Sequence, residues 1–335
     1  MNCYVKAAPL QLRCVVRLNG DMADFKLLSE KTSNLNVISA PRRSRRPNES
    51  KGTTADVCPF CPGREAEEPD VYRVGGQSGD SNWQIRVINN KFPFAPVHEV
   101  IVYSPDHHKG LDELPLGHAQ LVLETYQQRF NTYREKGNVY IFHNKGIQGG
   151  ESQPHPHTQL TVTPYDFDLA IPPLNRTYAY GSRLPFLGGK LKILGQVDGQ
   201  VIAPYETRHF VLFCPPTSQW PDEVWVAPKR RGGYFGDITA DEMADFTLAV
   251  SRLIQVMDIR HGHDFPHNFY IYPGENWYFR LIPRSKILGG FEVGTNVFVN
   301  TQDPHRTMAF IREHFENPDI EKIQAEHMAD YHRAV

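Results

Sequence analysis

The sequence lacks long apolar runs and a global excess of charge. None of its apolar stretches approaches the roughly 18 residues that a membrane-spanning helix needs. Lys6, Arg13 and Arg17 interrupt the start of the chain, which argues against a secretory signal. A formal net charge of −2 gives no basic field that would favour nucleic acid or an anionic membrane. We therefore expect a cytoplasmic protein that binds neither nucleic acid nor a membrane.

Cysteine is also scarce, with five in 335 residues, so a disulfide framework is not expected. Two of the five, Cys58 and Cys61, form the pair CPFC, whose spacing suits a metal site. Reduced structural cysteines are the alternative. Thioredoxin-like redox chemistry is disfavoured, because CPFCPGRE is not followed by a helix-forming pattern. Histidines are the candidates to complete a metal site, among them His107 and His108 in SPDHHKG.

The rest of the chain reads as a folded α+β protein without a short repeat. Alternating or apolar runs predict strands at 83–89, 98–104, 139–144 and 159–164, then at 209–216, 223–230, 268–273, 277–284 and 296–300. Helical spacing of apolar residues predicts helices over 117–137 and 238–262. Thr239 is placed to cap the second helix, with Glu242 as its capping-box partner. The two halves therefore use the same element types, as tandem copies of one unit would.

A segment rich in proline, glycine and asparagine, 166–185, marks a plausible boundary between the halves. We predict an N-terminal extension over residues 1–30, a first domain over 31–170 and a second domain over 171–335. Each domain is expected to be a mainly antiparallel sheet with helices.

The stretch GGESQPHPHTQ spaces His155, His157 and Gln159 two residues apart. In an extended strand these three side chains point to the same face. Three polar side chains on one face, beside a sheet core, require partners or a ligand. This spacing makes them candidates for a functional site.

Around this stretch the sequence resembles the galactose-1-phosphate uridylyltransferases of the histidine-triad superfamily. Their active-site pattern is Asn-x-Gly followed by Gly-x-Ser-x-x-His-x-His-x-Gln. It is matched here by Asn144, Gly146, Gly150, Ser152, His155, His157 and Gln159. The segments SAPRRSRRP, CPFCPGRE, SPDH, WYFRLIPR and GGFEVGTNVFVN resemble family motifs in the same order, so the likeness spans roughly residues 30 to 315.

The resemblance implies two tandem histidine-triad-like domains in a homodimer with sites near the interface. It also implies one zinc ion held by Cys58, Cys61, His107 and His155. His157 matches the family's nucleophile, which attacks the α-phosphorus of a nucleoside diphosphate sugar. Sugar 1-phosphate leaves, and a nucleotidyl-histidine remains until an acceptor phosphate takes the nucleotide.

This chemistry explains why the two histidines would have different roles. An imidazole nitrogen bound to Zn²⁺ has its lone pair occupied, whereas a nucleophile needs a free nitrogen and an anchored second nitrogen. Gln159 can donate to a phosphate oxygen from the same face. Ser152 and the amides around Gly149 and Gly150 can cradle the other oxygens, although an ordinary hairpin turn is the alternative for these three. Zinc would be structural, because no step requires water as the nucleophile.

Further substrate contacts are matched by motif. In PRRSRRP, the resemblance favours Arg43 and Arg46 as phosphate ligands over a solvated loop or a nucleic-acid patch. Asn90 matches a position near the nucleotide, and Asn144 a position in the active-site pattern that could equally form a turn. A C-terminal segment that contacts the phosphate or sugar end is matched by Gly289, Gly290, Phe291 and Glu292. A glycine turn before an edge strand is the other interpretation of that segment.

The chain departs from its relatives mainly in the second half. It has no second CxxC, and Asn276 stands where a histidine might precede Trp277, so a second metal site is not expected. His261, His263 and His267 follow a helix end, where capping histidines are common. In the strand before the arginines, Asn36 replaces a usual aromatic residue.

The leading hypothesis is a nucleotidyltransferase of the galactose-1-phosphate uridylyltransferase type, exchanging a nucleoside monophosphate between a nucleoside diphosphate sugar and a sugar 1-phosphate. The alternative is a nucleoside diphosphate sugar phosphorylase with inorganic phosphate as acceptor, because GGFEVGT resembles relatives that include a plant-type ADP-glucose enzyme. A nucleotide-binding protein without catalysis is a third hypothesis. The retained nucleophile and phosphate-binding positions argue against it.

Overall fold

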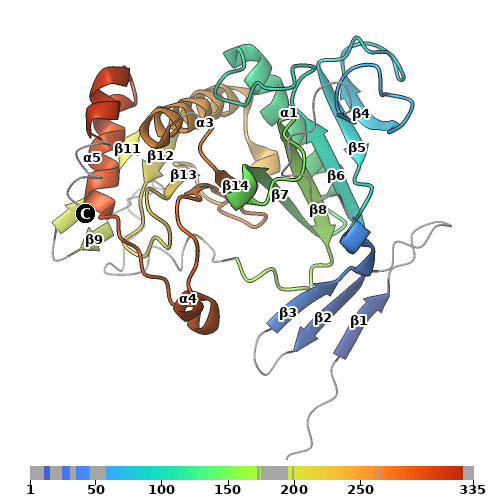
Figure 1. Cartoon of the computed structure of the whole chain (residues 1–335), viewed down its shortest axis with the longest axis horizontal. Coiled ribbons are helices and arrows are strands. Elements are labelled where there is room, and N and C mark those ends of the chain that lie inside the picture. The colour runs from blue at the N-terminus through green and yellow to red at the C-terminus, as the bar shows by residue number, and fades with distance from the viewer. Residues whose placement is uncertain are drawn as a thin grey trace, which may run out of the picture.

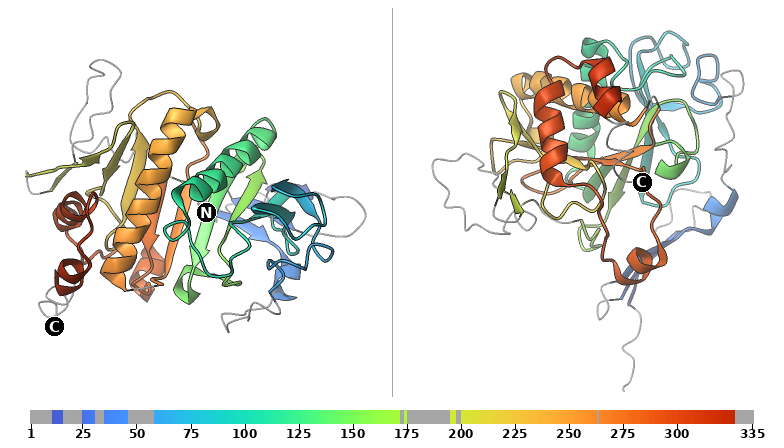
Figure 2. Two further views of the ribbon diagram at one scale, coloured as in Figure 1. Left: turned by 90° about the horizontal axis from the view of Figure 1, so that it is seen from above. Right: turned by 60° about the vertical axis from the view of Figure 1, so that its left-hand side comes forward.

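The computed structural model describes residues 11–15, 25–30, 35–45, 58–171, 174, 195–197, 200–262 and 264–326. Most of the secondary structure belongs to one large antiparallel sheet with helices on one face (Figures 1 and 2). Its first five strands are β4 (Asp70–Val74), β5 (Ile85–Asn89), β6 (Val97–Val102), β7 (Asn138–Lys145) and β8 (His157–Thr163). The other five are β11 (Tyr205–Glu206), β12 (Phe210–Phe213), β13 (Val224–Pro228), β14 (His267–Ile271) and β15 (Phe279–Pro283).

Two smaller sheets, the helices and short 3-10 turns complete the described architecture. A three-stranded sheet contains β1 (Gln11–Val15), β2 (Lys26–Glu30) and β3 (Leu35–Ser39), and a two-stranded one contains β9 (Gly195–Val197) and β10 (Gln200–Ile202). The helices are α1 (Leu116–Tyr133), α3 (Ala240–His261), α4 (Gly290–Thr295) and α5 (Pro304–His314). Short 3-10 turns are η1 (Pro41–Arg45), η3 (Ile147–Gly149) and η4 (Phe235–Asp237). No helix in the described part of the chain is long and apolar enough to cross a membrane.

The strand order of the large sheet is β11-β12-β13-β15-β14-β7-β8-β6-β5-β4. Read inward from its edge, the first half runs β4, β5, β6, β8, β7, and the second half runs β11, β12, β13, β15, β14. In both halves the last two strands along the chain are therefore exchanged in the sheet. Each half also inserts one long helix before its fourth strand, α1 in the first and α3 in the second. The halves join where β7 pairs with β14, in a register that sets Phe142 opposite Tyr270. An α+β fold built on a large antiparallel sheet is confirmed, while the predicted domain boundaries remain predictions.

The main core lies between the sheet and the two long helices, which pack side by side across it (Figure 2). On β7 the alternation of side chains sends Val139, Ile141 and His143 toward the helices, and leaves Tyr140 and Phe142 on the opposite face. The same alternation on β8 sends Leu160 into the helix-side core.

The capping box at the start of α3 is confirmed: Thr239 accepts from the amide of Glu242, and Glu242 accepts from the amide of Thr239 at 2.9 Å. The strand predicted over 296–300 is wrong. The preceding glycines instead begin the short helix α4, and Asn296 closes it in the left-handed conformation, with φ of 56°. The segment is then held by Asn300, which donates to the carbonyl of Ser218 at 3.0 Å. An alternating pattern predicts an extended backbone, but it cannot supply a neighbouring sheet edge.

Candidate functional site

The turn between β7 and β8 positions the candidate site at one end of the sheet. Gly146 and Gly150 have φ of 73° and 78°, a region that disfavours other residues. Glu151 closes the turn by accepting from the amide of Gly146 at 2.9 Å. Gly149 allows close approach to the second half, because a Cβ there would lie 2.9 Å from the carbonyl of His267. The chain then enters β8 at His157, between β6 and β7.

Four predicted metal ligands from three separate segments converge beside this turn. Cys58, Cys61, His107 and His155 are all buried, and one ligand atom from each lies within 4.8 Å of every other. The Sγ of Cys61 lies 3.2 Å from Nδ1 of His107 and 3.5 Å from Nδ1 of His155. The Sγ of Cys58 lies 3.7 Å from Nδ1 of His155.

These separations fit a tetrahedral zinc site. Zn–S and Zn–N bonds of about 2.3 and 2.1 Å give ligand–ligand edges of about 3.6 Å in a tetrahedron. The second nitrogen of His155 donates to the carbonyl of Ser104 at 2.8 Å, as an orienting outer contact of a metal ligand does. Burial lowers the pKa of His155 to about 4, so the ring is neutral and its Nδ1 lone pair is available to a metal. The cluster is therefore consistent with one zinc ion.

His157 is oriented differently from His155. Its Nδ1 donates to the carbonyl of His155 at 2.8 Å, which leaves Nε2 with the lone pair in the neutral ring. The side chain is 5% exposed and lines a pocket of about 190 Å³ together with Phe60, Ser152 and Gln159. The ring of Phe60 meets the His157 imidazole edge-on, with centroids 5.2 Å apart. The two neighbouring histidines thus face a metal cluster and a pocket respectively.

Gln159 faces the same pocket and is held by His98 of β6 and by Asn90, which directly follows β5. The Oε1 of Gln159 lies 2.9 Å from Nε2 of His98 and 3.3 Å from Nδ2 of Asn90. Nδ1 of His98 accepts from the amide of Phe94 at 3.4 Å, so the proton is on Nε2 and is donated to Gln159. Both contacts fix the amide oxygen of Gln159 and leave its NH₂ group as the donor. Asn90 was expected at the site; His98 was not, although it lies on the same face of β6 as Val100, the residue opposite Gln159.

The predicted arginines are only partly described. Arg43 lies on η1, where its Nη1 donates to the carbonyl of Phe92 at 2.9 Å and its guanidinium lies 4.7 Å from the Phe94 ring centroid. Phe92 lines the His157 pocket, so these contacts place Arg43 at the pocket's edge. Arg46 lies outside the described residues. Asn36 donates to the carbonyl of Asp168 at 2.9 Å.

Asn144 and Gly149 are linked through a residue of the second half. The Nδ2 of Asn268 donates to Oδ1 of Asn144 at 2.8 Å and to the carbonyl of Gly149 at 2.7 Å. Arg284 in turn donates to Oδ1 of Asn268 at 2.7 Å. Strand β14 therefore supports the turn before His157. Sequence reasoning missed this contact because it joins residues more than a hundred positions apart.

The C-terminal segment is not brought to the pocket within the described chain. Gly289, Gly290, Phe291 and Glu292 form the start of α4, which projects from the body of the molecule (Figure 1). None of them lines the His157 pocket. Glu292 accepts from the amide of Gly289 at 3.1 Å and pairs with Lys286, so its carboxylate stabilises the helix start.

Of the histidines predicted to follow the end of α3, His261 and His267 are described and have structural contacts. His261 ends α3 and lies 3.1 Å from a carboxylate oxygen of Asp222, which also pairs with Arg260. His267 is buried on β14, and His263 lies outside the described residues. Glu313, His314 and Glu326 form another group close enough to share an ion, but Glu313 is exposed, and exposed acidic groups gather without a metal.

Comparisons with known proteins agree with this geometry. Residues 86–165 match the family model of galactose-1-phosphate uridyl transferase, N-terminal domain. The chain is 25% identical over 333 residues to an ADP-glucose phosphorylase of Arabidopsis thaliana, covering 86% of this chain and 92% of that protein. It is 25% identical over 309 residues to a galactose-1-phosphate uridylyltransferase of Thermotoga maritima, covering 83% and 94%.

Solved structures extend the likeness to the fold. The crystal structure of an Arabidopsis thaliana ADP-glucose phosphorylase with bound ADP-glucose aligns with a TM-score of 0.64 at 25% identity. The alignment covers 87% of this chain and 99% of that one. A uridylyltransferase structure aligns with the same TM-score at 21% identity, which supports the fold alone. Over most of its length the chain is therefore similar to galactose-1-phosphate uridylyltransferases and to an ADP-glucose phosphorylase, and its residues 86–165 match the N-terminal-domain model of the galactose-1-phosphate uridyl transferases.

Proposed function

We propose that the protein transfers the nucleoside monophosphate of a nucleoside diphosphate sugar through a covalent intermediate on His157. The observation that carries this proposal is the 2.8 Å bond from Nδ1 of His157 to the carbonyl of His155. This bond fixes the ring and leaves the Nε2 lone pair for attack on the α-phosphorus. The P–O bond to the sugar 1-phosphate breaks as the P–N bond forms. An acceptor phosphate oxygen then displaces His157 and carries the nucleotide away.

The other pocket residues support charge stabilisation at the phosphorus. The NH₂ group of Gln159, held by His98 and Asn90, would donate to a non-bridging oxygen. Ser152, which lines the pocket, would bind another phosphate oxygen. The amides of Gly149 and Gly150, expected to do the same, instead donate to the carbonyls of Gly146 and Ile147 at 3.0 Å, so these glycines shape the turn. Arg43 and Arg46 would neutralise the diphosphate. Asn90, which lines the pocket, would contact the nucleotide end, and Asn144 would be a further substrate contact.

A structural zinc ion on Cys58, Cys61, His107 and His155 is part of the proposal. Bound there, it would tie the segment 58–61 and the loop after β6 to the residue two positions before the nucleophile. Its place is supported by the four converging ligand atoms. Reduced thiols persist in the cytoplasm, so such a site fits a cytoplasmic enzyme.

Two acceptors fit this chemistry. A sugar 1-phosphate would make the protein a uridylyltransferase-type enzyme, as the active-site motif suggests. Inorganic phosphate would make it a nucleoside diphosphate sugar phosphorylase. The second candidate is favoured by the likeness to the Arabidopsis ADP-glucose phosphorylase over 86% of this chain. A binding protein without catalysis is disfavoured by the retained geometry of His157 and Gln159.

We further propose that two tandem histidine-triad-like domains form each subunit and that the active enzyme is a homodimer. The repeated strand order of the two halves supports the tandem arrangement. The segment around α4 exposes Ile287 by 79%, Phe291 by 58% and Val293 by 72%, a concentration of apolar surface that a second subunit would cover. In such a dimer α4 would reach the sugar end of the partner's site.

Intact-mass spectrometry tests the proposal directly. The zinc-loaded protein is incubated with UDP-glucose or ADP-glucose, and we expect a mass increase equal to one nucleoside monophosphate that is absent in His157→Ala. The size of the adduct identifies the base. Adding either phosphate or galactose 1-phosphate to the isolated adduct then identifies the acceptor by which one discharges it. An adduct that persists in His157→Ala would refute the assignment of the nucleophile.

A further inference from the structure

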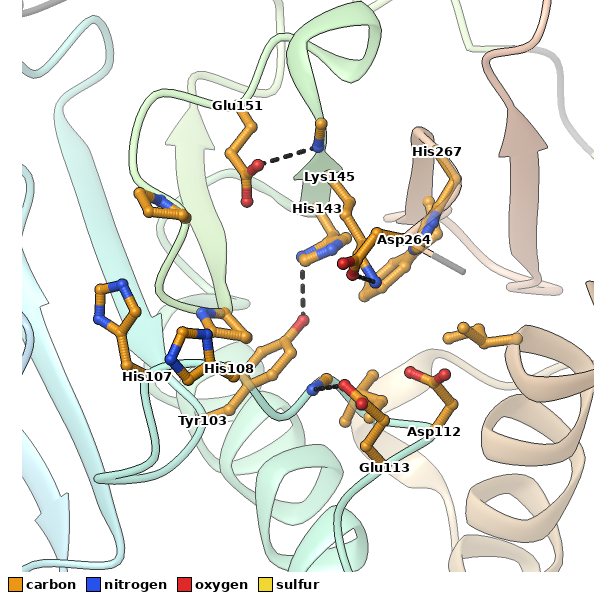
Figure 3. A pocket seen from close by; sticks show the side chains of 17 residues that line it. Tyr103, His107, His108, Asp112, Glu113, His143, Lys145, Glu151, Asp264 and His267 are labelled. Atoms are coloured by element: carbon orange, nitrogen blue, oxygen red, sulfur yellow. Dashed lines mark hydrogen bonds and ion pairs between the residues drawn. The ribbon is translucent and has the colours of Figure 1, made fainter. Parts of the chain in front are cut away.

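A second cavity lies behind the strand that carries His157, on the helix side of the sheet (Figure 3). It encloses about 490 Å³, a volume typical of small-molecule sites. Its walls come from the loop before α1, the end of β7, the turn before β8, the helix α3 and the start of β14. It shares no lining residue with the pocket that contains His157 and Gln159.

Two buried imidazoles supply unused acceptors to this cavity. His143 is 6% exposed and His267 is 2% exposed, and both line it. Nδ1 of His143 donates to the carbonyl of His157 at 2.7 Å, and Nδ1 of His267 donates to the carbonyl of Phe265 at 3.1 Å. Burial lowers the pKa of both rings, so both are neutral at physiological pH. Each Nε2 is therefore an acceptor that a bound group with N–H donors can satisfy.

The charged side chains around the cavity have predominantly one sign. Four carboxyl groups line it, from Asp112, Glu113, Glu151 and Asp264, against the single amine of Lys145. Lys145 is already paired with Asp264 at 3.1 Å (Figure 3). Such a lining attracts cations and repels phosphates. The cavity is thus unlike the nucleotide pocket, where the family pattern gathers arginine and amide donors.

We propose that this cavity binds a small organic ammonium ion, with its N–H groups bonded to Nε2 of His143, Nε2 of His267 and the carboxyl group of Asp112. Asp112 is the central carboxyl group for such an ion. It is largely buried, and the charge of Lys145 acts on it from a distance, while its hydrogen bond comes from its own backbone amide. An ammonium group offers three donors, which matches two imidazole nitrogens and one carboxylate.

An ion bound in this cavity would affect the candidate active site from the opposite, helix-side face of the sheet. The same His143 ring that would bind the ammonium group at Nε2 holds the backbone of His157 through Nδ1. Tyr103 supports this connection, since its hydroxyl lies 3.0 Å from Nδ1 of His143 (Figure 3). The same hydroxyl lies 2.5 Å from the hydroxyl of Thr158. Occupancy would therefore restrict the strand that carries the nucleophile. This consequence, unlike the binding site itself, rests on the proposed role of His157.

Calorimetric titration of the zinc-loaded full chain with 1,4-diaminobutane tests the site without reference to activity. We expect saturable binding with a dissociation constant of about millimolar, as a ligand of six heavy atoms allows. Asp112→Asn should weaken binding about tenfold, the loss expected from about 1.4 kcal/mol of interaction. The matched control is Glu313→Gln, which removes an exposed carboxylate of α5 and should leave the affinity unchanged.

Binding that survives in the presence of saturating ADP-glucose supports a site separate from the nucleotide pocket, and competition between the two overturns it. Equal affinity in Asp112→Asn, or no saturable binding to the wild-type chain, also refutes the proposal. The connection to His157 is checked by the rate of adduct formation with saturating amine. A rate that changes in the wild type but not in Asp112→Asn supports the connection, and an unchanged wild-type rate refutes it.

Discussion

Replacing His98 with phenylalanine tests whether the orientation of Gln159 controls nucleotidyl transfer. His98 is 3% exposed, and its Nε2 donates to Oε1 of Gln159 at 2.9 Å. Phenylalanine keeps a ring of similar size against Phe94, whose centroid lies 4.4 Å from that of His98, but it removes the donor. The substitution therefore releases the amide of Gln159 while leaving most of the packing in place.

The expected magnitude follows from what the released amide can do. If Gln159 turns over, it presents Oε1 to a phosphate oxygen, and a hydrogen bond to a charged group worth about 1.5–3 kcal/mol is lost. That range corresponds to roughly a tenfold to 150-fold loss of rate. Asn90 still lies 3.3 Å from Oε1 and retains part of the orientation. We therefore expect a loss near the lower end, about tenfold.

Rapid-quench measurement of adduct formation in a single turnover gives this rate directly, and zinc content shows that the fold is intact. A double-mutant cycle with Gln159→Ala isolates the positioning role. His98→Phe should cost about tenfold in the wild-type background and almost nothing when Gln159 is alanine. The control His209→Phe replaces a histidine paired with Asp241 in the second half and should leave the rate unchanged. Equal losses in both backgrounds would show that His98 does not act through Gln159.

Four further outcomes follow from the structure. His157→Ala should keep its zinc and form no adduct, whereas His155→Ala should lose the metal; atomic absorption that reverses this order would exchange the two roles. Burial raises the pKa of Asp112 to about 6, so its carboxyl group binds a proton more tightly in the folded state and the free energy of unfolding falls as pH rises from about 4 to about 6. Asp112→Asn should therefore stabilise the protein by up to about 3 kcal/mol at pH 8 and about half that at pH 5 in urea unfolding, and a gain independent of pH would contradict this. Glu99→Gln leaves the guanidinium of Arg129, now 2.6 Å from that carboxylate, without its counter-charge, and should destabilise the fold by about 3–5 kcal/mol in the same assay. The pair Phe291→Ser and Val293→Ser should shift a homodimer toward monomer in light scattering, and an unchanged mass would place the interface elsewhere.

The parts of this molecule that the sequence predicts best are those with local patterns. The two-residue spacing of His155, His157 and Gln159 predicts a common face, and His157 and Gln159 indeed line one pocket on β8. His155 precedes the strand, so its ring is free to turn toward Cys58 and Cys61 instead. The periodicity of residues 238–262 and the cap at Thr239 likewise predict α3 with its start correctly placed.

What the sequence could not predict depends on contacts between distant segments. His98 acquires its contact with Gln159 only because β6 pairs with β8 in a register that sets Val100 opposite Gln159. The cavity behind His157 requires the loop before α1 and the start of β14 to meet, and no local pattern specifies that meeting. The strand predicted over 296–300 failed for the same reason, since alternation is necessary for a strand but a partner edge is also required.

The second half of the sheet repeats the strand order of the first but carries different side chains. Its β15 occupies the same place in the strand order as β8, but it carries Arg280. That guanidinium donates to Glu223 at 2.8 Å and to the hydroxyl of Tyr270 at 3.0 Å, so the strand carries a buried charge pair. A permanently charged guanidinium cannot act as a nucleophile. What this half contributes instead is Asn268, which holds Asn144 and the turn at Gly149 from across the β7–β14 junction. The continuous sheet therefore lets the second half support the turn before His157, and a substitution at Asn268 should affect chemistry on β8, a strand that does not pair with β14.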